Sequence, residues 1–372
     1  MKEAIIIGGG LAGLTCAILL QKNGYEVTLI EKKKYPFHRV CGEYISNEVL
    51  PFLESLNIHV SELEPSSLTQ LSLTSVSGKI LQVPLPLGGF GLSRYKFDNL
   101  LFQHAEKLGV KFIFEKVIDV RFNEDKFKLT LSDNRIYESA IAIAAYGKRS
   151  NLDQKLKRRF FYHRSPYLGV KYHIKTDLPD NLIRLDNFEG GYCGVCKIEE
   201  DKYSLCYLSE TSNLKKYAGI SKMEEQVLFK NPHLKHLFKN SEFLFEKPEV
   251  INEISFERKT LVEDHLLFCG DAAGMITPLC GNGMAIAIHS GKILAESIIR
   301  FAGKAKTFDR TALERDYEQR WKKQFALRLK SGRLIQKLFG NTHISNLSVS
   351  ALSKFPSFIR LLVKKTHGKA FI

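Results

Sequence analysis

Four short apolar runs predict strands that are buried on both faces. They cover residues 4–7, 26–30, 140–145 and 265–269, and continuous apolar runs of this length are typical of parallel strands covered by helices. Residues 11–23 and 285–301 instead carry apolar side chains at helical spacing and predict buried helices. Strands that alternate with helices in this way indicate an α/β fold.

Other segments predict a second layer that is mostly β. In residues 68–87, Thr and Ser alternate with apolar residues, and Pro84 and Pro86 follow. This pattern predicts edge strands that enter a second sheet. A hairpin is predicted where the turn Ser132-Asp133-Asn134 separates two short strand-like runs. The stretch from 151 to 250 is rich in Tyr, Phe and Val and predicts further strands. Beyond Ala302 the chain reads as mainly helical.

A glycine-rich turn joins the first strand to the first helix. Gly8, Gly10 and Gly13 occupy G-x-G-x-x-G positions, and Leu11 and Ala12 open the helix. The first glycine permits a tight turn, the second lets backbone approach a diphosphate, and the third lets helix and strand pack closely. The helix N-terminus adds amide donors and partial positive charge. The turn predicts a dinucleotide site; the alternative is an ordinary strand–turn–helix unit without a nucleotide.

An acidic residue at the end of the second strand supports the dinucleotide interpretation. Glu31 follows the run 26–30, close to the spacing of the acid that binds a ribose in such sites. A carboxylate there suits two ribose hydroxyls and would repel a 2′-phosphate.

A second glycine-rich turn points to FAD. Gly270 and Asp271 end the run 265–269, and the chain then leads into the helix at 285–301. An Asp at a strand end can accept a hydrogen bond from a ribityl hydroxyl, and amides at the next helix start can face the flavin N1/C2=O edge. The alternative for Asp271 is a helix cap or an Asx turn.

On these residues the chain resembles the FAD-dependent superfamily of para-hydroxybenzoate-hydroxylase-type monooxygenases, flavin-dependent halogenases and geranylgeranyl reductases. The similar segments also include Cys41-Gly42-Glu43, Arg94 and Gly147-Lys148-Arg149-Ser150. The resemblance implies that Arg94 contacts FAD near its phosphates or adenosine, and that Gly270 and Asp271 hold the ribityl–pyrophosphate region. It implies that residues 36–43 pass near the flavin, with Arg39 as a phosphate or flavin contact. It places four residues at the border of the isoalloxazine: Pro278, Gly281, Gly283 and Met284.

Catalytic residues are harder to predict, because the flavin itself carries the electrons. Three weak candidates are Glu43, Cys41 and Cys280. Glu43 reads equally as a proton donor or as a carboxylate at a helix N-terminus. Cys41 and Cys280 would either form a redox-responsive disulfide or simply pack beside the flavin. No metal site is predicted, because the single C-x-x-C at Cys193 and Cys196 lacks a second pair of ligands.

These patterns predict an α/β chain with a Rossmann-like FAD-binding domain interleaved with a mostly β substrate domain, plus a helical C-terminal region. The predicted FAD-binding domain comprises residues 1–60, 90–150 and 251–302. The substrate domain comprises 61–89 and 151–250, and the helical basic region comprises 303–372.

The net charge of +15 is concentrated near the C-terminus. After Glu318 there is no Asp or Glu, whereas twelve Lys and Arg residues follow. An apolar helical stripe (Leu327, Leu334, Ile335 and Leu338) runs beside Lys330, Arg333 and Lys337. Two interpretations stay open and can coexist: a docked helix with a solvated basic face, or a surface helix on anionic lipid. Nucleic-acid binding is not expected, because no recognised motif accompanies the charge.

The sequence predicts a cytoplasmic protein, with the inner membrane surface as a second location. No secretion signal precedes the first strand, the seven cysteines indicate a reducing compartment, and no apolar run is long enough to span a bilayer.

The predicted function is that of an FAD-dependent monooxygenase-type oxidoreductase, which uses NAD(P)H and O2 on a lipophilic or aromatic small molecule. The alternative is a geranylgeranyl-reductase-like enzyme that reduces isoprenoid double bonds, and a minor alternative is a non-catalytic lipid-binding relative. Halogenases carry W-x-W-x-I-P, but the single Trp of this chain is Trp321. Prenyl reductases carry Y-x-W-x-F-P, whereas the corresponding strand here reads Tyr192-Cys193-Gly194-Val195-Cys196-Lys197.

Overall fold

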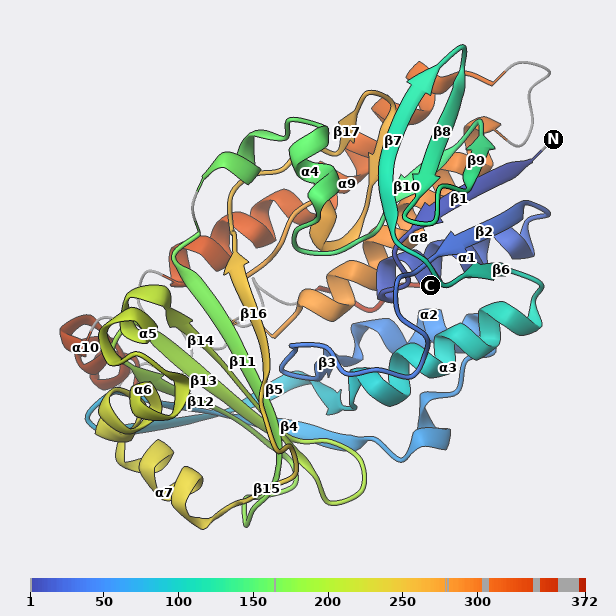
Figure 1. The fold of residues 1–372 in the computed structure, drawn as a ribbon. Coiled ribbons are helices and arrows are strands. Elements are labelled where there is room, and N and C mark those ends of the chain that lie inside the picture. Colours follow the sequence, from blue (N-terminus) through green and yellow to red (C-terminus); the bar gives the residue numbers. More distant parts are fainter. Residues whose placement is uncertain are drawn as a thin grey trace.

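The computed structural model of the 372-residue chain describes residues 2–163, 165–277, 279, 281–302, 308–336, 342–353 and 368–372. The strands of this described part form sheets of six, nine and three strands. The six-stranded and nine-stranded sheets occupy different halves of the molecule, and the chain passes between them several times (Figure 1).

The six-stranded sheet contains all four predicted buried strands. Its order is β17-β18-β10-β1-β2-β6, and every neighbouring pair is parallel except β17 with β18. Its strands are β1 (Glu3–Ile7), β2 (Glu26–Ile30), β6 (Lys111–Ile113), β10 (Ala142–Ala144), β17 (Val262–Glu263) and β18 (Leu266–Phe268). The parallel strands that carry the two glycine-rich turns therefore end at the same edge of the sheet.

Helices cover this sheet and confirm the predicted α/β class. They include α1 (Leu11–Lys22), α3 (Arg94–Lys107) and α8 (Gly283–Ala302). Helix α1 is buried along most of its length and packs against both α3 and α8. This burial explains why α1 is apolar on nearly all sides, as expected for a helix inside a layered core.

The nine-stranded sheet has the order β15-β11-β14-β13-β12-β4-β5-β3, and β16 pairs with β11. Its strands are β3 (Tyr44–Ser46), β4 (Ser66–Thr74), β5 (Ile80–Gly91), β11 (Tyr167–Lys175), β12 (Leu182–Phe188), β13 (Gly191–Lys197), β14 (Tyr203–Glu210), β15 (Glu242–Phe243) and β16 (Glu249–Ile254). Strand β3 pairs only with residues 89–91 of β5. At Pro84 and Pro86, β4 is therefore the one described neighbour of β5, and the other side of β5 is a local edge. Such an edge tolerates proline, because no hydrogen bond from that position to a second strand is lost.

One face of the nine-stranded sheet is covered by helices that the sequence analysis missed. These are α5 (Thr211–Tyr217), α6 (Ile220–Gln226) and α7 (Pro232–Asn240). Met223, Leu234 and Leu237 from α6 and α7 join the core on that face. The stretch 151–250 is therefore less purely β than predicted, and the division of the chain into domains stays a prediction.

The three-stranded sheet confirms the predicted hairpin. Strands β8 (Lys126–Leu131) and β9 (Ile136–Ser139) pair antiparallel around the turn at 132–135, and β7 (Val117–Asn123) flanks them. Two short helices, α2 (Leu50–Ser55) and α4 (Asn151–Lys155), lie in the connections.

Helix α9 (Arg310–Gln336) docks on the six-stranded half through side chains spaced four residues apart. Leu313, Tyr317, Trp321, Phe325 and Leu329 are all buried. The predicted stripe is not this docking face, because Leu327 and Leu334 are 70% and 67% exposed. Ile335 and Leu338 of that stripe lie outside the described side chains. Helix α10 (Thr342–Ser353) follows and contacts β5. No helix in the described ranges is both long and apolar enough to cross a membrane.

The docking face of α9 generates a stability prediction. Phe325→Ala should lower the free energy of unfolding by about 3–5 kcal/mol, because it leaves a cavity where a fully buried ring was. Leu327→Ala, two residues away on the exposed face, should change it by less than about 0.5 kcal/mol. Urea denaturation of both variants measures the difference. Similar losses in the two variants would show that α9 does not dock through this face.

Candidate active site

The first glycine-rich turn has the geometry that the motif predicts. Gly8 has φ +105°, and a Cβ there would lie 2.6 Å from the Ala145 carbonyl oxygen. A Cβ on Gly13 would lie 2.1 Å from the Gly8 carbonyl oxygen, so α1 and β1 pack at glycine distance. A Cβ on Gly10 would instead meet only the Arg94 guanidinium, at 3.7 Å. Gly10 therefore faces open space at the N-terminus of α1, as a diphosphate cradle requires.

Glu31 lies directly beside this turn. Its buried carboxylate accepts a hydrogen bond from the Gly9 amide at 2.9 Å. It also forms an ion pair with Arg39, at 3.1 Å. Arg39 also donates to the Gly9 carbonyl oxygen at 3.3 Å, and the Tyr35 hydroxyl donates to the same oxygen at 2.5 Å. Glu31 and Arg39, predicted separately from the sequence, thus form one contact over the glycine-rich turn.

Asp98 joins the two predicted arginines and was missed by the sequence analysis. Arg94 makes two bonds to its carboxylate, at 2.5 and 2.7 Å, and Arg39 adds a third at 3.0 Å. Asp98 is buried, on the first turns of α3. Its sequence signal was the four-residue spacing from Arg94, which places both side chains on one helix face.

The second glycine-rich turn lies against the first. Gly270 has φ +61°, and a Cβ there would lie 2.8 Å from the Ala12 side chain. Its amide donates to the Ser290 hydroxyl of α8, which also accepts from the Trp321 indole of α9. The structure therefore brings together two motifs that are far apart in the sequence.

One buried cation and one partly buried cation hold the second turn through its carbonyl oxygens, and no motif had indicated them. Arg158 pairs with Asp153 at 2.9 Å and donates to the Ala272 carbonyl oxygen at 2.9 Å. Lys259 donates to the carbonyl oxygens of Asp271 and Lys148 at 2.8 and 2.7 Å. Burial lowers the pKa of Lys259 to about 8. Lys259 thus joins the Gly147–Ser150 segment to the Gly270–Ala273 turn.

Glu43 is buried between the two halves of the molecule. It has φ +58°, and its carboxylate accepts bonds from Lys171 at 2.5 Å, His173 at 2.7 Å and the Arg94 amide at 2.7 Å. Burial opposes its ionisation, but Lys171 and His173 outweigh this effect and lower the pKa of Glu43 to about 2. The Glu43 carboxylate is thus ionised and accepts the first backbone amide of α3. This favours its interpretation as a carboxylate at a helix N-terminus over that as a proton donor.

The flavin end of the predicted site is described in part. Gly281 has φ +63°, and a Cβ there would lie 2.9 Å from the Tyr44 ring. Gly283 and Met284 open α8, with Met284 buried. Pro278 and Cys280 lie outside the described residues, so their predicted roles and the pairing of Cys280 with Cys41 stay predictions. Cys41 is partly exposed, and its carbonyl oxygen accepts a bond from Ser204 of β14.

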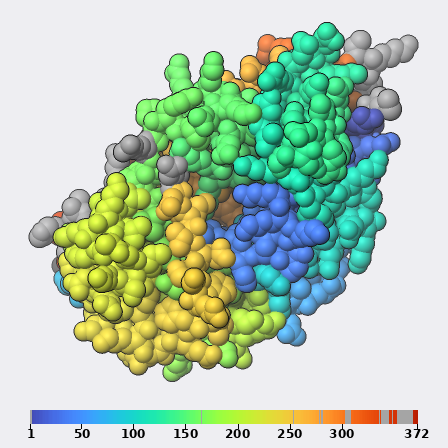
Figure 2. All heavy atoms as spheres, viewed as in Figure 1, coloured from blue at the N-terminus to red at the C-terminus, as the bar shows by residue number. Residues whose placement is uncertain are grey.

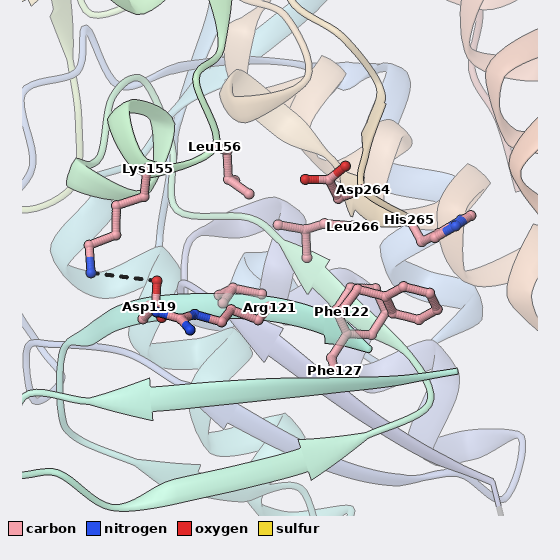
Figure 3. Close-up of a pocket in the computed structure, with 10 residues that line it drawn as sticks. Asp119, Arg121, Phe122, Phe127, Lys155, Leu156, Asp264, His265 and Leu266 are labelled. Carbon is pink, nitrogen blue, oxygen red and sulfur yellow. Dashed lines mark hydrogen bonds and ion pairs between the residues drawn. The ribbon is translucent and has the colours of Figure 1, made fainter. Parts of the chain in front are cut away.

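Figure 2 shows a hollow near the centre of this face, where blue N-terminal segments meet green and orange segments from later in the chain. A separate open cavity of about 730 Å³ lies elsewhere, between β7, α4 and the β17–β18 turn (Figure 3). Its lining includes Asp119, Phe122, Lys155 and His265, and none of the predicted cofactor residues. It adjoins the start of β18, whereas Gly270 follows the end of that strand, so this cavity is not the predicted flavin site.

No group of His, Cys, Asp or Glu side chains in the described ranges is arranged to hold a metal ion. Cys193 and Cys196, the C-x-x-C pair, are both buried on β13.

The described residues fit a bound dinucleotide. An open glycine turn at a helix N-terminus, two guanidinium groups beside it and a buried acid at the neighbouring strand end supply what a diphosphate and a ribose need. The second glycine turn touches the first at Ala12, where one extended ligand can contact both.

Comparisons with known proteins agree with this geometry. Residues 1–313 match the family model described as FAD binding domain. The chain is 25% identical over 344 residues to digeranylgeranylglycerophospholipid reductase 1 of Methanosphaera stadtmanae, a match that covers 85% of this chain and 79% of the relative. It is 26% identical over 342 residues to violacein synthase of Chromobacterium violaceum, which covers 82% of this chain and 79% of the relative.

Solved structures share the fold at low sequence identity. A flavin-dependent brominase matches with a TM-score of 0.81 and 20% identity, over 99% of this chain and 94% of that chain. A flavoprotein/dehydrogenase from Cytophaga hutchinsonii matches with a TM-score of 0.77 and 18% identity, over 98% and 92% of the two chains.

The two glycine turns predict how FAD affinity responds to substitution. Gly10→Val should fold, because the space at Gly10 is open, but its branched side chain should block the diphosphate and abolish binding. Asp271→Ala should weaken binding by about 1.5–3 kcal/mol through loss of a charge-assisted ribityl hydrogen bond. Titration of the apoprotein with FAD measures both. Unchanged affinity in both folded variants would refute the assignment of this site.

Proposed function

The chain belongs to the FAD-binding domain family and is an FAD-dependent oxidoreductase, and we propose that it carries out a monooxygenase-type reaction on a lipophilic or aromatic small molecule. NAD(P)H would supply the electrons and O2 the oxygen atom. Bound FAD supplies the electron-transfer chemistry, and the residues of the chain bind, orient and exclude water.

The observation that carries this proposal is an apolar layer on one face of the nine-stranded sheet. It is a cluster of buried side chains from β4, β5, β12, β13, β14 and β16, and Met275 and Leu279 of the segment between Asp271 and α8 and Val349 of α10 pack into it. Its members include Leu71, Leu73, Leu81, Val83, Leu85, Ile183, Leu185, Tyr192 and Leu208. Tyr44 belongs to the same layer and packs against Gly281. The apolar layer therefore adjoins the loop that the family resemblance places beside the isoalloxazine.

An apolar layer of this kind favours a substrate that is itself apolar. Burying hydrocarbon surface contributes about 25 cal/mol per Å², which supports binding without specific polar partners. These buried apolar side chains would also exclude water from the reaction beside a bound flavin.

Reduction of isoprenoid double bonds is the second candidate. It is favoured by the name of one relative, digeranylgeranylglycerophospholipid reductase 1, and by the many aliphatic side chains of the apolar layer, which suit a prenyl chain. Oxygenation and reduction differ in whether O2 is consumed, so one experiment separates them.

The proposed reaction predicts O2-dependent turnover. The purified holoenzyme, given NADPH or NADH with isotopically labelled O2 and a panel of aromatic and isoprenoid compounds, should yield a product that contains the label by mass spectrometry. The second candidate predicts instead an unlabelled product with two added hydrogens per double bond, formed without O2 by the reduced enzyme. NAD(P)H oxidation that no compound stimulates, with neither product, would refute both.

We further propose that the C-terminal region touches an anionic membrane surface. The docked helix α9 leaves Leu327 and Leu334 exposed, and Leu347 of α10 is 73% exposed. The segment after Glu318 contains basic residues and no acidic ones. Exposed apolar side chains beside an excess of positive charge are the features that hold a helix at an anionic interface.

This proposal predicts co-sedimentation with anionic but not neutral vesicles, lost at high salt. Each Lys or Arg at the surface would contribute about 1 kcal/mol. Leu327→Gln with Leu334→Gln should weaken binding, as should removal of residues after Gly340, while FAD stays bound. Ile136→Gln, which changes an exposed apolar residue of β9, is the matched control. Equal binding to both vesicle types, or none at low salt, would leave α9 a docked structural helix only.

A further inference from the structure

A buried ion cluster connects the nine-stranded sheet, which the proposed function makes the substrate sheet, to the predicted cofactor residues, and the proposed reaction makes no use of it. Lys171 and His173 lie on β11 of the nine-stranded sheet, and both are buried. Lys171 Nζ lies 2.5 Å from Glu43 Oε1, and His173 Nε2 lies 2.7 Å from Glu43 Oε2. Glu43 belongs to the segment that leads from β2 to β3. A lysine of the substrate sheet thus reaches a carboxylate on the cofactor side.

The cluster fixes the backbone of both cofactor-site arginines. Glu43 Oε1, the oxygen that binds Lys171, also accepts the Arg94 amide at 2.7 Å. Lys171 Nζ makes a second bond, of 3.3 Å, to the Arg39 carbonyl oxygen. The Lys171 ammonium group therefore holds two segments. It holds the start of α3 indirectly, through Glu43, and it holds the Arg39 backbone directly, by its own hydrogen bond.

The side chains of these arginines extend to the first glycine turn. Arg39 donates to the Gly9 carbonyl oxygen, and an Arg94 nitrogen lies 3.7 Å from where a Cβ on Gly10 would be. Asp98 binds both guanidinium groups, and Glu31 also pairs with Arg39, so two carboxylates match the two arginines. The ion pairs hold both guanidinium groups beside the turn where the diphosphate of the cofactor would lie.

Loss of Lys171 would leave the negative charge of the buried Glu43 carboxylate without its lysine partner. The carboxylate is fully buried, and His173 would be its remaining cationic candidate. A buried charge that loses its partner is strongly destabilised, so the carboxylate must move or take up a proton. Either change weakens its bond to the Arg94 amide, and the Arg39 carbonyl oxygen loses its donor at the same time.

We propose that Lys171 is a positioning residue for the adenosine diphosphate half of the cofactor, although it belongs to the substrate sheet. It acts through Glu43, Arg94 and Arg39 rather than by touching the cofactor. The proposal depends on FAD binding and not on which reaction follows. It has a distinctive consequence: a change in the substrate sheet should weaken binding of ADP, a ligand with no flavin ring.

Calorimetric titration of the FAD-free full-length chain with FAD and, separately, with ADP tests the proposal. Lys171→Met should raise the Kd of both ligands by about tenfold to hundredfold, the effect of one lost charged hydrogen bond. Lys175→Met is the matched control, because Lys175 lies on the same strand but is 54% exposed, and it should change neither Kd. Unchanged affinity for both ligands, or weaker FAD with unchanged ADP, would overturn the proposal.

A second pair of variants separates positioning from loss of folding. Glu43→Gln keeps the shape of the side chain but removes its charge, so it should also weaken ADP binding. The double variant Lys171→Met with Glu43→Gln should bind ADP better than Lys171→Met alone, because it leaves no unpaired buried charge. Circular dichroism confirms that each variant is folded before titration. Folded single variants with wild-type ADP affinity, or a double variant no better than Lys171→Met, would contradict the proposal.

Discussion

The close packing of helix α1 is the constraint on which the rest of the structure depends. A Cβ on Gly13 would lie 2.1 Å from the Gly8 carbonyl oxygen, and a Cβ on Gly291 of α8 would lie 2.4 Å from the Ala12 carbonyl oxygen. Only glycine fits at either contact. Helix α1 is thereby held between the first glycine turn and α8. This packing brings Gly270 against Ala12 and makes one site from two distant motifs.

Charged residues complete that site, and most of them form ion pairs that are at least partly buried. Asp98 pairs with Arg39 and Arg94. Glu43 pairs with Lys171 and His173, and Asp153 pairs with Arg158 beside the second turn. Buried pairs contribute little net stability compared with apolar residues of similar size, but breaking one is costly. Members of these pairs also hold backbone: Arg39 donates to the Gly9 carbonyl oxygen, Lys171 to that of Arg39, and Arg158 to that of Ala272.

The sequence predicted the features that depend on local pattern. The strands β1, β2, β10 and β18, the helix α1 and the hairpin β8–β9 follow from runs and spacings of neighbouring residues. The fixed spacing of the glycine motif also allowed Gly8, Gly10 and Gly13 to be assigned separate roles. The contacts of Gly8 and Gly13 match the tight turn and the close packing, whereas the diphosphate contact at Gly10 stays a prediction.

Residues whose roles depend on distant partners were not predictable in this way. Lys171 lies within an otherwise apolar strand pattern, and nothing near it in the sequence indicates Glu43, 128 residues away. Gly291 looks like any glycine inside a helix until α1 is placed against it. The docking face of α9 was not predicted, because the apolar stripe that includes Leu327 and Leu334 lies on another side of that helix and is exposed.

The contact between Ala12 and Gly291 also has a consequence for synthesis of the chain. These residues are 279 positions apart, and at about 5–20 residues per second a ribosome needs roughly 15–55 s to make that stretch. During this interval the apolar surface of α1 that α8 will cover has no partner from its own chain. Native topology with such long-range contacts folds slowly. Until α8 is made, the N-terminal segment therefore exposes an apolar surface that a chaperone could cover.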